Sequence, residues 1–265
     1  MLRIARERLR QRYRTTGFPR GEAPALPARF RGLPLIDATR CIDDCRACIE
    51  SCPTGALSRG PDGGPGEPGH GRLALDLGAC LFCADCAAAC KEGALAFSGD
   101  YRLATRRRED LVLGEADLRL ASALGRELLR VLGRSLKLRQ VSAGGCNACE
   151  ADANVLTTVG WDIGRFGIQF VASPRHADGL LVTGPVTRNM RSALEKTWEA
   201  VPDPKIVIAS GACAISGGPY AGAEEVHGGA ASVVPVDLFV PGCPPHPLTL
   251  LDGVLRLLGR IREGR

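Results

Sequence analysis

Short apolar runs alternate with longer amphipathic stretches along the second half of the 265-residue chain. An apolar run that ends at glycine or proline predicts a buried strand, and apolar residues three or four positions apart predict a helix. The predicted strands are 138–142, 166–171, 180–183, 205–209 and 233–240, and the predicted helices are 189–200 and 248–258. Because strands and helices alternate, we expect residues 138–265 to form a doubly wound α/β domain with a parallel sheet.

The first half of the chain lacks this alternation. Residues 4–13 have helical spacing, and the prolines in 21–36 predict an extended course over a surface. Residues 1–36 are therefore expected to form a basic, proline-rich arm. A helix with leucines on one face is predicted for 117–138, at the end of a linker that spans 101–137.

The chain contains twelve cysteines. No apolar run approaches the roughly 20 residues that span a bilayer, and the charged N-terminus lacks a signal-peptide core, so we expect a cytoplasmic protein. A reducing compartment disfavours disulfides, and cysteines two or three residues apart rarely pair with one another. Metal binding is therefore the better interpretation of the cysteines.

Eight of these cysteines form two matched sets within residues 37–100, which we expect to be a ferredoxin-like domain. The second set has the C-x2-C-x2-C-x3-C spacing of a bacterial two-cluster ferredoxin; the first set has one extra residue and a proline after its fourth cysteine. In such a domain three thiolates of one loop bind one face of a 4Fe–4S cluster, and the fourth reaches across to the other cluster. The first cluster is expected on Cys41, Cys45, Cys48 and Cys90, and the second cluster on Cys80, Cys83, Cys86 and Cys52.

Zinc is the alternative metal for these eight cysteines. Structural zinc sites use four ligands, commonly two C-x2-C pairs, whereas this chain has two matched sets of four. The glycine- and proline-rich segment 60–71 between the sets predicts a flexible surface insert. Its His70 is expected to be solvated rather than a metal ligand.

The other four cysteines follow predicted strands of the α/β domain. Cys146 and Cys149 lie on a glycine turn between a strand and a helix, and Cys213 and Cys243 each follow a later strand. The carboxyl ends of parallel strands meet at one edge of the sheet, where ligands collect. We therefore expect these four thiols to form a third iron–sulfur site.

Positive charge is concentrated at the start of the chain. The formal net charge is +5, and the first 20 residues contain seven arginines and one acidic residue, so the remainder is nearly neutral. Such an arm is suited to anionic lipid or to a partner subunit. Nucleic acid is not expected, because aromatic residues are few and no recognition-helix pattern follows. No dinucleotide or phosphate-loop motif is present either.

Longer motifs give both halves a family resemblance. The first half resembles the two-cluster ferredoxin subunit of formate hydrogenlyase and complex I in segments 14–19 and 30–34 and in its paired cysteine sets. The second half resembles the small subunit of membrane-bound, energy-converting nickel–iron hydrogenases, formate hydrogenlyase among them. The segments that carry this second resemblance are 146–150, 165–167, 173–178, 181–187, 211–213 and 240–245. The chain is thus similar to a fusion of two neighbouring subunits that are homologous to subunits of the complex I peripheral arm.

The resemblance implies a flavodoxin-like second domain with a proximal 4Fe–4S cluster on Cys146, Cys149, Cys213 and Cys243. It also implies that the nickel–iron site lies in a separate large subunit. The chain would then be an electron-transfer subunit with three 4Fe–4S clusters, served by an electron-donor subunit or a ferredoxin, and inactive as a hydrogenase on its own. Membrane subunits would hold it indirectly on the inner face of the cell membrane.

Two other functions are alternatives. One is a quinone-reducing module subunit of a complex I-like NADH or ferredoxin dehydrogenase. The complex I subunit has adjacent cysteines at the position where two residues separate Cys146 from Cys149, as in the hydrogenases. The other is a non-redox, zinc-binding assembly scaffold.

Three side chains near the third cysteine set are candidates for proton relay or for tuning of the cluster. The family motif has an acid after the second cysteine and a glutamate two residues further on, where this chain has Glu150 and the shorter Asp152. After Cys243-Pro244-Pro245 the family usually has arginine, and this chain has His246. A histidine could link the cluster potential to pH, and the alternative is a tolerated surface substitution.

Overall fold

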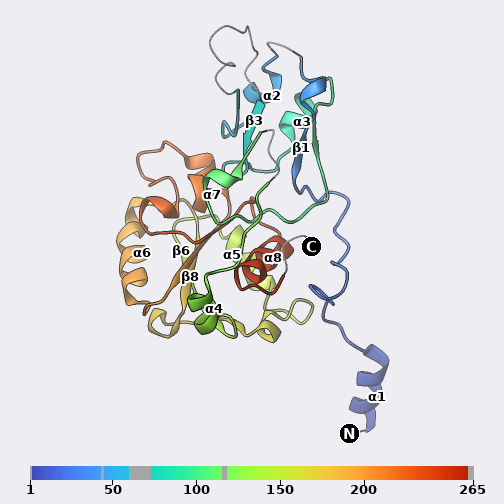
Figure 1. Cartoon of the computed structure of the whole chain (residues 1–265), viewed down its shortest axis with the longest axis vertical. Helices are drawn as coiled ribbons and strands as arrows, with labels where there is room; N and C mark the ends of the chain where they lie inside the picture. The colour runs from blue at the N-terminus through green and yellow to red at the C-terminus, as the bar shows by residue number, and fades with distance from the viewer. Residues whose placement is uncertain (1, 43–44, 60–72, 115–117, 262–265) are drawn as a thin grey trace.

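The computed structural model describes residues 2–42, 45–59, 73–114 and 118–261. A smaller unit lies above a larger α/β unit, and the N-terminal helix α1 (Leu2–Gln11) projects from the opposite end (Figure 1). The predicted insert 60–71, with His70, lies outside the described residues. Among the residues that are described, no helix is long and apolar enough to cross a membrane.

The larger unit contains a five-stranded parallel sheet. Its strands are β6 (Leu136–Ser142), β7 (Ile168–Phe170), β8 (Gly179–Thr183), β9 (Ile206–Ser210) and β10 (Leu238–Val240). The spatial order is β10-β9-β8-β6-β7, which in chain order is the 2-1-3-4-5 arrangement of a flavodoxin-like, doubly wound sheet. Strands β8 and β9 are buried throughout, because both faces of a parallel sheet are covered. The predicted fold class is confirmed.

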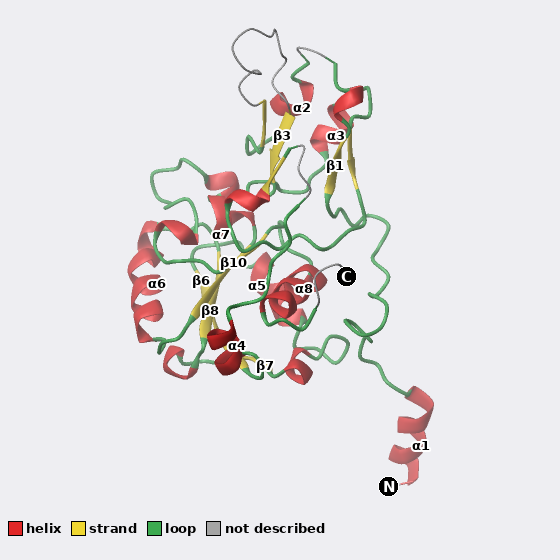
Figure 2. Cartoon of the chain, in the orientation of Figure 1, coloured by secondary structure: helices red, strands yellow, loops and turns green. Residues whose placement is uncertain are grey.

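Helices pack against this sheet (Figure 2). They are α4 (Arg126–Leu132), α5 (Ala148–Val155), α6 (Arg188–Ala200), α7 (Ala212–Ser216) and α8 (Pro247–Leu257). Every residue of α8, which was predicted as a terminal helix over 248–258, is buried. Linker residues cover it: the N–H of Leu124 donates to the carbonyl of Leu257 at 2.9 Å, and Ala104 lies against Gly253.

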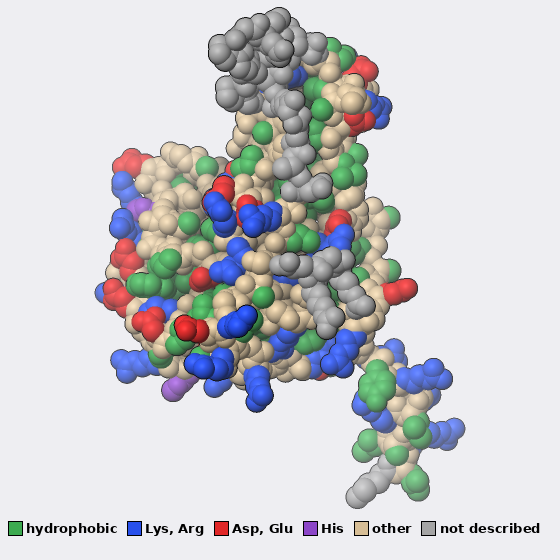
Figure 3. All heavy atoms as spheres, in the orientation of Figure 1, with side chains coloured by type: hydrophobic (Ala, Val, Ile, Leu, Met, Phe, Trp, Pro, Cys, Tyr) green, Lys and Arg blue, Asp and Glu red, His purple; other side chains and the backbone are tan. Residues whose placement is uncertain are grey.

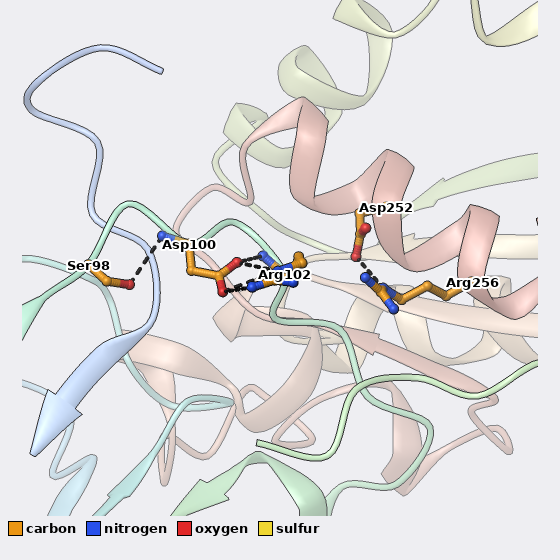
Figure 4. Close-up of polar contacts among 5 residues, drawn as sticks. All are labelled: Ser98, Asp100, Arg102, Asp252 and Arg256. Atoms are coloured by element: carbon orange, nitrogen blue, oxygen red, sulfur yellow. Dashed lines mark hydrogen bonds and ion pairs between the residues drawn. The ribbon is translucent and has the colours of Figure 1, made fainter. Parts of the chain in front are cut away.

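Helix α8 also contains a buried ion pair. Nε of Arg256 donates to Oδ2 of Asp252 at 2.8 Å, and the two side chains are 3% and 2% exposed. Burial raises the pKa of Asp252, and the Arg256 guanidinium opposes that rise. A second, more exposed pair lies nearby on the linker, where Arg102 donates to Asp100 through two nitrogens (Figure 4).

The smaller unit consists of two similar halves, each with a strand, a cysteine loop, a short helix and a second strand. Its elements are β1 (Pro34–Ile36), α2 (Ala47–Glu50), β2 (Leu57–Arg59), β3 (Leu73–Asp76), α3 (Asp85–Ala89), β4 (Leu95–Phe97) and β5 (Val112–Leu113). Strand β1 pairs antiparallel with β4, and β2 pairs antiparallel with β3. Each half therefore exchanges a strand with the other half, as in a two-cluster ferredoxin.

Three predicted elements are shorter than expected, one of them the strand predicted for 166–171, which is limited to β7. The helix predicted for 117–138 forms only over α4, which Gly125 and Gly133 bound, and residues 118–124 before it form neither helix nor strand. Ala121 and Leu124 of this segment are nevertheless buried in the core, so the apolar spacing reflects burial rather than a helix. The strand predicted for 233–240 is limited to β10, since Pro235 has no N–H for a sheet ladder.

Short 3₁₀ helices connect several of these elements. They are η1 (Ala38–Arg40), η2 (Glu109–Leu111), η3 (Ile163–Phe166), η4 (Pro174–His176), η5 (Gly218–Tyr220) and η6 (Ala230–Ser232).

The N-terminal arm has a free part and an attached part. Helix α1 has no buried residue, and its arginines are exposed along its length (Figure 3). The attached part begins at Thr15, whose Oγ1 donates to the carbonyl of Val159 at 2.9 Å, and the N–H of Thr16 donates to the carbonyl of Gly160 at 2.9 Å. Phe18 is buried edge-on against Tyr101, and Nη2 of Arg165 donates to its carbonyl at 2.8 Å.

The two units share one hydrophobic core. Leu77 and Leu111 of the smaller unit belong to the same buried cluster as Ile215 of α7. The approach is close at Gly78, where a Cβ would lie 2.6 Å from Cγ2 of Ile215. Nη1 of Arg108 donates to Oδ1 of Asp76 at 2.8 Å beside this contact. The packing therefore fixes the smaller unit against the helix that carries Cys213.

Candidate iron–sulfur sites

The first cysteine set surrounds one cavity. Cys41, Cys45 and Cys48 come from the loop before α2 and its start, and Cys90 comes from the end of α3; all four line a cavity of about 220 Å³. Cys48 is buried, and burial, followed by the neighbouring Cys41, raises its pKa. Cys45 is exposed. The structure thus brings Cys90 to the three cysteines of the other repeat.

The second set surrounds a narrower cavity, lined by Cys80, Cys83, Cys86 and Cys52. Burial raises the pKa of Cys80 to about 12 and that of Cys86 to about 11, and Cys52 is among the thiols that add to both shifts. Thiols in such surroundings stay protonated unless a cation offsets the charge of the thiolate. Cys80 and Cys86 therefore fit a buried, metal-bound group better than they fit free thiolates.

The exchanged cysteines have the same local geometry in both repeats. The N–H of Ala56 donates to Sγ of Cys52, and the N–H of Ala94 donates to Sγ of Cys90, each at 3.2 Å. A glycine with positive φ precedes each donor, which permits the turn that aims the N–H at the sulfur. The repeat seen in the sequence is therefore also a repeat of hydrogen bonding to sulfur.

The third set forms at the carboxyl edge of the parallel sheet. Cys146 and Cys149 follow β6, Cys213 follows β9, and Cys243 follows β10. Burial raises the pKa of Cys149 to about 12, and the other three thiols of the set contribute. Burial raises the pKa of Cys213 to about 11, with Cys243 and Cys146 as the next causes. The four cysteines are brought together from three loops that are far apart in the chain.

Glycines make room for the sulfur atoms of this third set. Gly211 has a φ of +95°, and a Cβ there would lie 2.5 Å from Sγ of Cys149. Gly218 has a φ of +54°, and a Cβ there would lie 2.9 Å from Sγ of Cys213. Any side chain at either position would displace a thiol.

Soft thiolate ligands around a shared space are what iron–sulfur clusters require. Among the residues that the structure describes, no group of three or more His, Cys, Asp and Glu side chains is close enough to hold a single metal ion. The donor chemistry of the three sets fits clusters of iron and sulfide.

The two acids near Cys149 occupy different surroundings. Glu150 is buried and accepts a hydrogen bond from Oγ1 of Thr183 at 2.5 Å, at the end of the neighbouring strand β8. Asp152 lines a cavity of about 240 Å³ together with Cys243 and His246, and burial raises its pKa. The sequence did not single out Thr183, because a strand-end threonine carries no signal of its own.

His246 is half-buried and caps the start of α8. Its Nδ1 accepts a hydrogen bond from the N–H of Leu248 at 3.1 Å. Phe30 and Trp161 contact the imidazole edge-to-face, with centroids 5.3 and 6.0 Å away. Burial lowers the pKa of His246, so the ring is held neutral at pH 7.

The second cysteine set faces the third. Leu81 and Phe82 of the second cysteine loop line the same 240 Å³ cavity as Cys243. Arg31 of the N-terminal arm holds this loop, since its Nη1 donates to the carbonyl of Phe82 at 3.1 Å. The loop of the second set therefore lies beside the loop that carries Cys243 of the third set.

Comparison with known proteins identifies both units. The family described as NADH ubiquinone oxidoreductase, 20 kDa subunit, matches residues 146–257, which contain all four cysteines of the third set. A 4Fe–4S dicluster domain matches residues 40–94, which contain the other eight cysteines. The predicted resemblance to a fusion of these two subunit types is confirmed.

Three relatives match about half of this chain each. Formate hydrogenlyase subunit 7 of Escherichia coli (strain K12) is 46% identical over 136 residues, which are 51% of this chain and 53% of that protein. A probable membrane-bound hydrogenase subunit of Pyrococcus furiosus is 42% identical over 137 residues, 52% of this chain and 82% of that protein. An NADH-quinone oxidoreductase subunit of Heliobacterium modesticaldum is 40% identical over 122 residues, 46% of this chain and 70% of that protein.

The chain spans about half the length of the formate hydrogenlyase subunit that it matches. Most of the Pyrococcus and Heliobacterium proteins, in contrast, is covered by the match. The chain therefore belongs to the family of the 20 kDa subunit of NADH ubiquinone oxidoreductase, with a 4Fe–4S dicluster domain preceding the family domain.

Proposed function

We propose that this chain is an electron-transfer subunit of a membrane-associated, formate hydrogenlyase-like nickel–iron hydrogenase. The observation that carries the proposal is the grouping of twelve cysteines into three sets of four, each drawn from separate loops. We assign one 4Fe–4S cluster to each set. Such a cluster supplies one-electron steps, and the chain supplies the ligands and the path between them.

The order of the three sets gives the path a direction in space. The first set is at the outer end of the smaller unit and exposes Cys45, which suits an electron donor such as another subunit or a ferredoxin. The second set faces the third across the cavity near Phe82. The third set exposes Cys146 and Cys243, which suits contact with a partner chain.

The partner at the third set would be a large subunit that holds the nickel–iron site. All twelve cysteines of this chain are assigned to the three clusters, so the chain retains no cysteine for nickel. Hydrogen chemistry would therefore require the partner, and membrane attachment on the inner face of the cell membrane would come from further subunits. The relatives named as hydrogenase subunits support this assignment.

The test is metal analysis and spectroscopy of the full chain, purified without oxygen. The proposal requires about twelve irons per chain, four in each of three clusters, and EPR signals at low temperature after reduction. The isolated chain should not reduce a dye with hydrogen, whereas the chain co-purified with its large subunit should. A colourless, EPR-silent chain that contains zinc would establish the assembly-scaffold alternative instead.

A subunit of a complex I-like, quinone-reducing module is the second candidate. The family match and the Heliobacterium relative favour it. The two residues between Cys146 and Cys149 favour a hydrogenase, since the resemblance places adjacent cysteines in the complex I subunit. The large subunit decides between them: four nickel-binding cysteines would support hydrogen chemistry, and their absence would support quinone chemistry.

A further inference from the structure

The two cysteine repeats differ in charge at several corresponding positions, and at one of them the charged side chain contacts a cysteine sulfur. Arg59 is the seventh residue after Cys52, and Phe97 is the seventh residue after Cys90. Each is the last residue of its strand, β2 or β4, and the two strands have the same pattern of burial. The chain therefore offers an internal comparison between a guanidinium and a phenyl ring in equivalent places.

The Arg59 guanidinium contacts the first cysteine loop directly. Its Nη2 lies 3.6 Å from Sγ of Cys41 and donates to the carbonyls of Ile42 at 3.2 Å and Cys45 at 2.9 Å. These contacts fix a positive charge against a ligand sulfur and hold the loop that carries two ligands.

The equivalent position of the second repeat offers no charge. Phe97 lines the cavity of the second set, and its ring is tilted against Phe82 with centroids 6.3 Å apart. None of the residues that line this cavity, all of them described, is charged. The first cavity is lined by Arg40 and Lys91 together with Glu92.

We propose that Arg59 raises the reduction potential of the first cluster above that of the second. The inference rests on the proposed function, because it requires a cluster on each set. Reduction adds one negative charge to a cluster, and a nearby cation with a hydrogen bond to sulfur stabilises that charge. Phe97 provides neither, and Arg31 contacts the second loop at the carbonyl of Phe82, whereas Arg59 contacts a sulfur of the first set, so the second cluster keeps the lower potential. The outer cluster is then the one that is reduced first and that holds an arriving electron.

The experiment is an EPR-monitored redox titration of the full chain, purified without oxygen. Cys45→Ser identifies the signal of the first cluster, because Cys45 is a ligand of that set alone in the assignment. In the parent chain, the first-cluster signal should titrate at the higher potential of the two ferredoxin-type signals. Arg59→Gln should shift that signal to more negative potential and leave the second-cluster signal in place.

Two further variants make the comparison strict. Arg59→Lys keeps the charge but cannot reach the sulfur and both carbonyls at once, so a smaller negative shift is expected. Arg126→Gln makes the same change of charge on α4, remote from the smaller unit, and should shift no signal (Figure 1). If Arg59→Gln fails to retain its first cluster, the Arg59→Lys variant decides by the same titration.

Unchanged potentials in iron-replete Arg59 variants would overturn the inference, and so would equal shifts of both signals. A parent chain in which the second cluster is reduced first would also overturn it. Failure of the proposed function has a different signature, which is a parent chain without the two ferredoxin-type signals or without the corresponding iron.

Discussion

The sharpest test of the third site is the substitution Gly211→Ala. Gly211 lies between the end of β9 and the start of α7, with a φ of +95° that only glycine adopts readily. The new methyl would lie 2.5 Å from Sγ of Cys149, whereas ordinary contacts are 3.4–4 Å. The thiol must therefore move by about 1 Å, which is the scale of error that disables a preorganised site.

The destabilising effect of Gly211→Ala has two parts. A non-glycine residue in this backbone region costs on the order of 1–3 kcal/mol. The clash adds displacement of a ligand, because the Cys149 sulfur is too close to the new methyl, whereas the carbonyl of Gly242 and the ring of Pro245 lie at an ordinary 3.6 Å. The structure therefore predicts loss of the third cluster with retention of the other two.

Gly222→Ala is the matched control. Gly222 has a φ of +83°, yet a Cβ there meets nothing within 4 Å, so the substitution carries the backbone strain without the clash. Iron analysis should give about eight irons per chain for Gly211→Ala and about twelve for Gly222→Ala, with the ferredoxin-type EPR signals present in both. A Gly211→Ala chain with its full iron and an unaltered third signal would refute the geometric argument.

Three further substitutions probe the buried polar groups. Asp252→Leu removes the buried carboxylate that Arg256 contacts and should lower the free energy of unfolding by about 3–5 kcal/mol. In thermal unfolding, the double substitution Asp252→Leu with Arg256→Met should recover most of this loss. Equal losses in the single and the double variant would contradict this interpretation. Thr183→Val removes the hydroxyl that donates to buried Glu150, an expected cost of about 1–3 kcal/mol in the same assay, and an unchanged midpoint would show that the contact is dispensable. Burial lowers the pKa of His246 below that of the unfolded chain. As the pH falls, the unfolded chain therefore takes up the proton first. The stability that His246 contributes is present above a pH of about 6.5 and is lost as the pH falls below it. The parent should therefore lose more stability than His246→Gln between about pH 7.5 and pH 5.5, and parallel losses would rule out this role.

Local sequence patterns determined the architecture of the α/β unit. The apolar runs at 180–183 and 205–209 became the central strands β8 and β9, because a strand covered on both faces must be apolar at every position. The cysteine spacing likewise identified the two repeats, since ligand geometry is encoded within a few residues. Convergence of Cys146, Cys213 and Cys243 followed from the fold alone, because parallel strands end at one edge.

Tertiary structure decided what depends on contacts between distant segments. The leucines of 117–138 fit a helix by spacing, but Leu124 is buried against the end of α8 in a segment that forms no helix. The cap formed by His246, the place of Thr183 beside Glu150 and the reach of Arg59 to Cys41 were likewise settled by packing. A periodic pattern records which residues prefer the interior, whereas the partner that each residue meets there is set only when the whole chain packs.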